Sequence, residues 1–369
     1  MKSICGCRGG LIALVLAVTV PGATFADARL VGDLPRIGNR PLTALPRVET
    51  EYGEIDTAEG TRLRSIVTKP AGKAGRLPAI LFVHWLSCDS VDFPVNASDG
   101  WSVMLTRLIE ESGWLVQRID KSGIGDSTGT PCATLDYRSE LAQHRAALDA
   151  LLSRPDVDPK RVVIFGASMG STYAPLLAAE RPVAGVIVWG GGATTWFERT
   201  LLFERHALEL GATNPGLLAP EMSERAAFLE RYLIRGESPA EIARTDPALG
   251  RVWSRLVANG PGLHYGRPIS FDQQAQGQNW PAAWARVHAP VLVLFGEYDW
   301  FESQEAAALI VEVVNRLRPT TAEFAVIPAT NHHFTRYASR QAAYTEIGGT
   351  VDAGPAVERI LAWLRRFGG

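Results

Sequence analysis

The segment Arg161–Thr172, RVVIFGASMGST, constrains the fold of this chain more than any other segment. An apolar run of β type ends at Phe165, the turn GASMG follows (residues 166–170), and a helical pattern begins after it. Glycines two residues before and two residues after the serine leave room where a strand and a helix approach closely. The pattern predicts that Ser168 lies on a very tight, strained turn, with its hydroxyl projecting above a sheet.

The G-x-S-x-G pattern between a strand and a helix resembles the nucleophile turn of the α/β-hydrolase superfamily. DVDPKR, which precedes the strand, is also common at this place in the superfamily. The resemblance implies that Ser168 attacks a carbonyl carbon and that a general base activates its weakly nucleophilic hydroxyl. The alternative is a serine in a glycine turn that only packs.

The chain order of the superfamily, serine then acid then histidine, implies the partners of this serine. VLVLFGEYDW places Asp299 just after a strand; Glu297 competes, and the strand–G-x-x-D pattern of the superfamily favours Asp299. The alternative for Asp299 is an acid that caps a helix beginning near Ser303. Two histidines follow, in ATNHHFTRY, and the His-x-Phe pattern of the superfamily favours His332 as the base, with His333 as the alternative. The base would accept the serine proton, and the acid would orient the imidazole.

The resemblance also implies backbone donors for an oxyanion. Met169 N–H, next to the serine at the start of the helix, is one expected donor. The other should come from the loop after the predicted strand in AILFVHWL, where superfamily members often carry His-Gly. Here Trp85 follows His84, so by position we expect Leu86 N–H to be the second donor, with Trp85 N–H as the other choice. The side chain of Trp85 could equally be a packing residue.

Short apolar runs predict buried parallel strands at residues 79–85, 114–119, 161–165, 183–189, 290–295 and 322–327. A more polar run at Arg62–Thr68 predicts a strand nearer an edge of the sheet. Helical patterns lie between these runs, at Ser139–Ser153, Tyr173–Glu180 and Pro355–Phe367. Strands that alternate with helices predict an α/β fold with a doubly wound, mostly parallel sheet.

Residues 193–285 interrupt this alternation. They hold no convincing strand and read as helices, at Thr195–Leu210 and Glu221–Ile234, followed by a polar loop, FDQQAQGQNW. The stretch is too long for a loop and predicts a helical cap over the carboxyl edge of a core formed by residues 27–192 and 286–369. Its apolar side chains could line an acyl pocket or simply pack the cap on the core: Trp196, Phe197, Phe203, Phe228, Trp253 and Leu256.

The first 26 residues are predicted to be a secretory signal peptide. Two basic residues precede Leu11–Val20, which is apolar apart from one threonine and is followed by Pro-Gly and small residues. Ten helical residues reach only about 15 Å, roughly half of the bilayer core, which disfavours a permanent membrane anchor. Cleavage after Ala26 or after Ala28 would fit, and the protein is expected to be periplasmic or secreted.

Two cysteines, Cys88 and Cys132, remain after removal of such a signal, because Cys5 and Cys7 lie within it. By spacing alone they are either one disulfide or two buried thiols. In the resembled fold, the strands that precede them are neighbours and point the same way, about 4.8 Å apart. The resemblance therefore implies a Cys88–Cys132 bridge.

Composition excludes some functions. The chain has 37 basic and 39 acidic residues, a net charge of −2, and so lacks a strong basic field that could hold nucleic acid. The segment RIDKSGIGDSTG is a poor nucleotide loop, because its third glycine is late and Pro131 blocks the expected helix; it resembles the D-x-R-G-x-G-x-S loop of the superfamily. Neither a cofactor nor a metal is predicted.

Most of residues 62–192 and 286–369 resembles bacterial exported esterases and dipeptidyl-aminopeptidase-like members of the superfamily, through HWLSCDSVDFP, KSGIGDSTGTPC and GEYDW. The resemblance implies hydrolysis of a small-molecule ester. The alternatives are an exported aminopeptidase or acyl-peptide hydrolase with the same residues and a non-catalytic binding protein with a decayed site.

Overall fold

A computed structural model describes residues 45, 47–93, 97–257, 259–260 and 263–368. The predicted signal peptide, with its cysteines and its cleavage site, lies outside the described residues. Within the part of the chain that the structure describes, no helix combines the length and the apolar character needed to cross a membrane.

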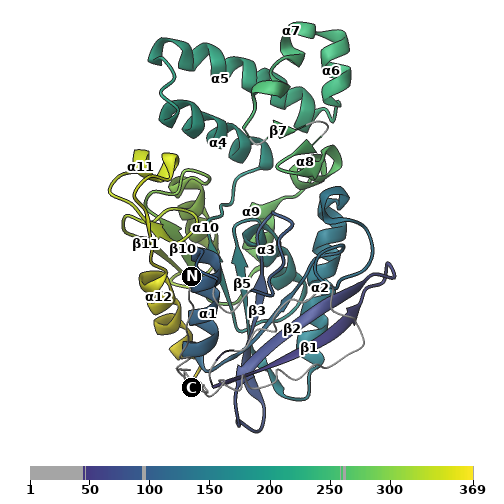
Figure 1. The fold of residues 1–369 in the computed structure, drawn as a ribbon, viewed down its shortest axis with the longest axis vertical. Helices are drawn as coiled ribbons and strands as arrows, with labels where there is room; N and C mark the ends of the chain where they lie inside the picture. The colour runs from purple at the N-terminus through teal and green to yellow at the C-terminus, as the bar shows by residue number, and fades with distance from the viewer. Residues whose placement is uncertain (1–44, 46, 94–96, 258, 261–262, 369) are drawn as a thin grey trace, which may run out of the picture.

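An eight-stranded sheet forms the centre of the fold (Figure 1). Its strands in chain order are β1 (Val48–Asp56), β2 (Arg62–Pro70), β3 (Leu77–Val83), β4 (Leu115–Ile119), β5 (Val157–Ala167), β6 (Gly185–Trp189), β10 (Val291–Gly296) and β11 (Ala322–Ile327). They lie side by side in the order β1-β2-β4-β3-β5-β6-β10-β11. β2 pairs antiparallel with β1 and β4, and the pairs from β4 to β11 are all parallel. The predicted mostly parallel sheet is confirmed.

Helices cover both faces of the sheet, so successive residues of a strand enter different cores. On β5, Val163 and Phe165 belong to the cluster that contains α1 (Gly100–Ser112) and α12 (Gly354–Leu364). Val162 and Ile164 belong to the opposite cluster. That cluster holds side chains of α2 (Tyr137–Ser153), α3 (Gly170–Glu180) and α10 (Gln304–Leu317). Burial on both faces explains why the central strands appear in the sequence as continuous apolar runs.

α1 is not among the helices predicted from the sequence, although its end signals are present. Asp99 accepts a hydrogen bond from the Ser102 amide at the start of the helix, and Gly113 ends it in the left-handed conformation, with φ 67°. α10 begins after Ser303, where the sequence predicts a helix start. α11 (Arg340–Thr345) and the two-residue strands β12 (Thr335–Arg336) and β13 (Thr350–Val351) complete the C-terminal part.

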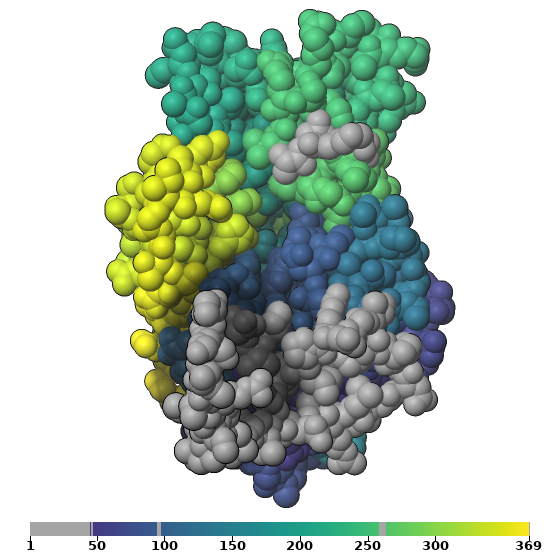
Figure 2. Space-filling view, viewed as in Figure 1, coloured from purple at the N-terminus to yellow at the C-terminus, as the bar shows by residue number. Residues whose placement is uncertain are grey.

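The segment between β6 and β10 is mainly helical. Its elements are α4 (Trp196–Leu210), α5 (Pro215–Leu229), a π-helical turn (Glu230–Ile234), α6 (Pro239–Thr245), α7 (Pro247–Gly250), a 3-10 turn (Trp253–Arg255), β7 (Asn259–Gly260), β8 (Leu263–His264), β9 (Arg267–Pro268), α8 (Ile269–Gln276) and α9 (Trp280–Arg286). In Figure 1, α4 to α8 lie together beyond one end of the sheet, and we call this group the cap. Its teal and green side chains form the upper end of the face seen in Figure 2.

The predicted polar loop FDQQAQGQNW is wrong, because its first six residues belong to α8. Phe271 and Ala275, four residues apart, are fully buried on one side of this helix. The carboxylate of Asp272 is also buried and accepts hydrogen bonds from Trp196 Nε1 and the Tyr232 hydroxyl. Its polar partners come from distant segments. The local sequence of α8 therefore shows polar residues, as a loop would, without the partners that allow their burial. β7, β8 and β9 are too short to show a strand pattern.

Cys88 and Cys132 form a disulfide with their Cα atoms 5.7 Å apart. Cys88 lies beyond the end of β3, and Cys132 opens a short 3-10 turn beyond β4. β3 and β4 are parallel neighbours, as the resembled fold requires. The bridge therefore joins two loops at the same edge of the sheet.

Candidate active site

Ser168 lies on a strained turn between β5 and α3. Its φ is +54°, in the left-handed region that residues with a side chain rarely adopt. A Cβ at Gly166 would lie 2.4 Å from the carbonyl oxygen of Gly170, and a Cβ at Gly170 would lie 1.9 Å from that of Val83. Both glycines are thus required by close backbone approaches. The Ser168 amide donates to the Trp189 carbonyl at 2.8 Å, which fixes the turn on β6.

The fold brings Ser168, His332 and Asp299 into one chain of contacts. His332 Nε2 lies 2.8 Å from Ser168 Oγ, and its Nδ1 lies 2.6 Å from Asp299 Oδ2. The other oxygen of Asp299 accepts from the amides of Phe301 and Glu302 at 2.9 and 3.1 Å. Burial alone would raise the pKa of Asp299, but His332 and these two amides outweigh it and hold the pKa below its ordinary value. Asp299 is therefore an anion that faces the ring.

The structure places the competing residues elsewhere. Glu297 is exposed, and its carboxylate accepts from the Ala329 amide at 2.7 Å. His333 lines the same cavity as Ser168, but its ring packs edge-on at 5.5 Å from the His332 ring and 6.3 Å from the Trp101 ring. Burial, with the neighbouring His332, lowers the pKa of His333 to about 4, so this ring is neutral near pH 7.

Glycines after β6, which were not predicted as site residues, make room for the histidine. A Cβ at Gly190, whose φ is +61°, would lie 2.6 Å from His332 Cε1. A Cβ at Gly191 would lie 1.7 Å from Ser171 Oγ. Three successive glycines directly after a buried strand, in WGGGA, are the sequence signal that could have identified this contact.

The loop that carries His332 is held from two sides. Trp189 Nε1 donates to the His332 carbonyl at 3.0 Å. Asn331 Oδ1 accepts from the amides of His333 and Thr335 at 2.9 and 3.0 Å. These bonds set the backbone, and with it the direction of the imidazole.

The two residues expected to donate to an oxyanion, Met169 and Leu86, line the cavity beside Ser168. Met169 directly precedes the first residue of α3. Trp85 is 8% exposed, and its ring packs 4.9 Å from the Trp101 ring. The indole of Trp85 is thus part of the cavity wall.

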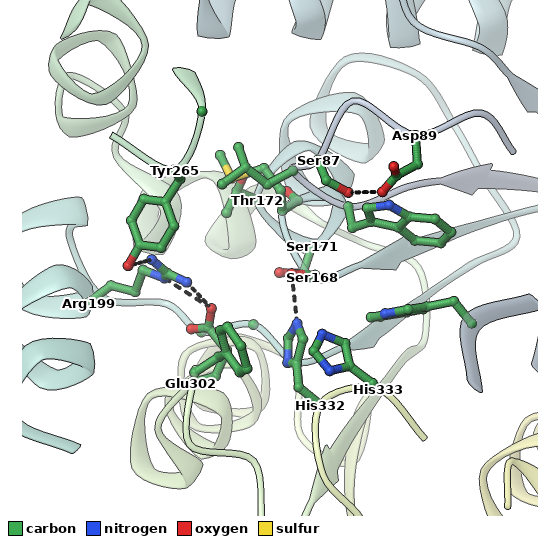
Figure 3. A pocket seen from close by; sticks show the side chains of 18 of the residues that line it. Ser87, Asp89, Ser168, Ser171, Thr172, Arg199, Tyr265, Glu302, His332 and His333 are labelled. Carbon is green, nitrogen blue, oxygen red and sulfur yellow. Dashed lines mark hydrogen bonds and ion pairs between the residues drawn. The ribbon is translucent and has the colours of Figure 1, made fainter. Parts of the chain in front are cut away.

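A cavity of about 750 Å³ surrounds Ser168 and is lined by both the core and the cap. In Figure 3, Arg199, Tyr265 and Glu302 lie on one side of Ser168, and Ser87 and Asp89 lie on the other. Of the cap residues singled out from sequence, Trp196 lines the cavity. The others are not among its lining residues and pack in or against apolar clusters and aromatic stacks: Phe197, Phe203, Phe228, Trp253 and Leu256.

An ion pair between the cap and the core was missed from sequence. Arg199, on α4, donates through Nε and Nη2 to one oxygen of Glu302, at 2.9 and 2.7 Å. Its guanidinium carbon lies 4.7 Å from the centre of the Trp196 ring. Burial raises the pKa of Glu302, against the opposing effect of Arg199. The two residues are 103 positions apart, so sequence spacing held no signal for the pair.

Among the described residues, no three His, Cys, Asp or Glu side chains are grouped so that they could hold a metal ion. The cavity presents the Ser168 hydroxyl and the His332 imidazole.

Comparisons with known proteins bear on the family and the fold of this chain. The model of the alpha/beta hydrolase family matches residues 80–346. An uncharacterised protein of Mycobacterium tuberculosis is 27% identical over 186 residues, which cover 49% of this chain and 61% of that protein. The quorum-quenching protein AidA of Acinetobacter baumannii is 37% identical over 76 residues, 20% of this chain and 25% of that protein. The chain thus matches only part of the length of these curated relatives.

Solved structures share the fold. An esterase of Pyrococcus furiosus superposes with a TM-score of 0.54 at 15% identity, covering 91% of this chain and 97% of that chain. Carboxyl esterase 2 of the fungus Tuber melanosporum superposes with a TM-score of 0.51 at 16% identity, covering 92% and 91%. At such identities the likeness concerns the fold alone.

Proposed function

This chain belongs to the alpha/beta hydrolase family, and we propose that it is a serine hydrolase that cleaves carboxylic esters through an acyl-enzyme on Ser168. The observation that carries the proposal is the continuous line of contacts from Ser168 Oγ through the His332 ring to the Asp299 carboxylate. Each member of that line has a position that suits one step of acyl transfer.

In the first half of the proposed reaction, His332 Nε2 accepts the hydroxyl proton while Ser168 Oγ bonds to the ester carbonyl carbon. The carbonyl oxygen becomes an oxyanion, which Met169 N–H and Leu86 N–H would stabilise. The bond to the alkoxy oxygen then breaks, and the proton held by His332 passes to that oxygen, so the alcohol leaves. Asp299 stabilises the imidazolium during this exchange.

In the second half, a water molecule gives a proton to His332 as its oxygen attacks the acyl carbon. The new tetrahedral intermediate collapses, the bond to Ser168 Oγ breaks, and the proton returns to that oxygen. The carboxylic acid leaves, and the enzyme regains its starting state.

The lining of the cavity favours an ester over a peptide with a free amino terminus. An aminopeptidase needs carboxylates that bind the substrate ammonium group, but Glu302 is already paired with Arg199. Asp99 accepts from the amide and the hydroxyl of Ser102, and Asp89 accepts from the Ser87 hydroxyl. Of these three acids, only Glu302 is paired with a cation within the described part of the chain, and the apolar rings around the cavity support an ester with an apolar acyl group.

We also propose that the protein works outside the cytoplasm. The Cys88–Cys132 disulfide supports this location, because disulfides persist in oxidising compartments. The predicted signal peptide is in line with the same proposal.

The test is hydrolysis of p-nitrophenyl esters of graded acyl length beside aminoacyl p-nitroanilides. We expect ester turnover by the native protein, loss of it in Ser168→Ala, and labelling of Ser168 by a fluorophosphonate. Ser153→Ala, an exposed serine at the end of α2, is the matched control and should keep full turnover. Full turnover by Ser168→Ala would overturn the mechanism, and turnover of anilides alone would replace the esterase by a peptidase.

A further inference from the structure

The loop after β3, residues 84–88, has an unusual anchor. Lys121 Nζ donates to the backbone carbonyls of three successive loop residues, Trp85, Leu86 and Ser87; the Leu86 and Ser87 contacts are both 3.3 Å. The Lys121 side chain is fully buried. Burial of an ammonium group costs free energy unless the group is paired and hydrogen-bonded, so Lys121 needs polar partners. Its bonds to the loop carbonyls supply part of this compensation.

A second buried cation reaches the same loop from the cap. Arg267, on β9, donates to the Leu86 carbonyl through Nε at 3.1 Å and through Nη2 at 2.5 Å. Its Nη1 donates to the Cys132 carbonyl at 2.7 Å, next to the disulfide that closes the loop at Cys88. Arg267 therefore joins the cap to both of the loops that the disulfide links.

Glu140, on α2, holds the two cations together. Its Oε1 lies 2.9 Å from Lys121 Nζ, and its Oε2 accepts from Arg267 Nη2 at 2.7 Å. The side chains of all three residues are at most 1% exposed. Two cations and one carboxylate leave one net positive charge beneath the loop.

Peptide geometry links these contacts to the Leu86 amide. In a planar trans peptide, the N–H of one residue points away from the C=O of the residue before it. The Trp85 carbonyl and the Leu86 N–H belong to the same peptide unit, so a Trp85 carbonyl bound to Lys121 turns the Leu86 N–H to the opposite side. Trp85, Leu86 and Ser87 line the cavity around Ser168, whereas Lys121 lies behind them.

We propose that Lys121 and Arg267, held by Glu140, are positioning residues that orient the Leu86 N–H toward the oxyanion. The inference rests on the proposed function and explains how a loop without the usual His-Gly sequence can present a donor. It also gives the cap a role in the reaction, because Arg267 belongs to the cap. The net positive charge beneath the loop acts in the same direction, since it favours negative charge on the substrate oxygen.

The test compares Lys121→Met and Arg267→Met with two matched controls. Lys69→Met removes a lysine paired with Glu51 on the edge strands, and Arg225→Met removes a buried arginine paired with Glu204 in the cap. The readouts are kcat and KM for a p-nitrophenyl ester, and the inhibition constant of a trifluoromethyl ketone whose serine adduct carries an oxyanion.

We expect Lys121→Met to lower kcat by about 10²- to 10³-fold, the usual effect of losing one oxyanion donor, with KM changed less than about threefold. The inhibitor affinity should fall by the same factor, because the adduct needs the same donor. The two controls should lose stability without this split between kcat and KM. Unchanged kcat and inhibitor affinity in Lys121→Met would overturn the proposal.

Glu140→Gln keeps the side-chain size and serves as the test if Lys121→Met does not fold. We expect it to lower kcat by about tenfold, less than Lys121→Met does. An unchanged kcat in Glu140→Gln would contradict the proposal. A crystal structure of Lys121→Met separates the inference from the proposed function. A rotated Trp85–Leu86 peptide supports the positioning role, and an unmoved peptide refutes it, whichever substrate the native protein turns over. Absence of ester turnover in the native protein would instead overturn the proposed function.

Discussion

His332 Nε2 lies 2.8 Å from Ser168 Oγ, although 164 residues separate the two in the chain. Contacts on other sides of the imidazole and its backbone keep it there. Asp299 faces Nδ1, Trp189 holds the carbonyl, and Gly190 leaves the space that the ring edge needs. Proton transfer in the proposed mechanism depends on all of these contacts, because a small displacement of the ring would remove it from the hydroxyl.

The choice of base can be tested directly. Removal of a residue that acts as a general base in such a triad costs on the order of 10⁴-fold or more in kcat. We therefore expect His332→Ala to lose ester turnover to that extent, and His333→Ala to lose less than about tenfold, since its ring only packs in the cavity wall. Steady-state rates on one p-nitrophenyl ester are the measurement. A greater loss in His333→Ala than in His332→Ala would reverse the assignment.

Gly190→Ala should lower activity by more than the strain of its backbone conformation explains. Gly190→Ala places a Cβ at a positive φ, which costs about 1–2 kcal/mol, and also 2.6 Å from His332 Cε1. Gly113→Ala has a similar φ of 67° but nothing within 4 Å of the new Cβ. Urea denaturation should show that the positive φ destabilises both variants. kcat should fall in Gly190→Ala and be retained in Gly113→Ala. Equal kcat in the two variants would count against the role of Gly190.

The buried histidines predict acid sensitivity of the fold. Burial lowers the pKa of His144 to about 4 from 6.5, against the opposing charge of Glu140, and burial holds the pKa of His84 well below 6.5. Between these values the unfolded chain binds protons that the folded protein does not, so stability falls as the pH drops from about 6.5 toward 4. For His144 alone, the loss in the free energy of unfolding approaches about 3 kcal/mol near the lower pH.

Urea denaturation at about pH 7 and about pH 5 measures this dependence. His144→Phe should weaken it, whereas substitution of the exposed His288 by glutamine should leave it in place. A dependence that is the same in His144→Phe and in the native protein would show that another group is responsible.

The ion pair between cap and core should behave as a buried pair. Arg199→Met leaves the Glu302 carboxylate, 7% exposed, without its cation, and we expect a loss of about 3 kcal/mol in the free energy of unfolding. The double variant Arg199→Met with Glu302→Leu should recover most of that loss, because two apolar groups need no partner. A double-mutant cycle by urea denaturation gives the coupling, and additive losses would refute it.

The disulfide should contribute substantially to stability. It closes a loop with a sequence separation of 44, for which loop-closure entropy predicts about 4 kcal/mol. A reductant should therefore lower the urea midpoint of the native protein. The same reductant should have no effect on the variant with Cys88→Ser and Cys132→Ser, which serves as the control. An unchanged midpoint in the reduced native protein would contradict the estimate.

Sequence reasoning succeeded where a single segment carries its own pattern. The strands β3, β6 and β10 are buried along their whole length, so each shows a continuous apolar run. It failed at α8, whose polar composition predicts a loop. Asp272 in that helix is satisfied by Trp196 and Tyr232, which lie 76 and 40 residues away. No local pattern can anticipate such a partner.

The sequence by itself determined the sheet and the place of Ser168 in it, because apolar runs and glycine spacing act through sterics and burial within a few residues. Only the tertiary structure decided what surrounds that serine. Arg199 meets Glu302, and Lys121 and Arg267 converge on one loop, because folding places the ends of separate strands and a cap side by side. Ion pairs and hydrogen bonds act over a few ångströms, and the separation of two residues along the chain does not predict the distance between their side chains.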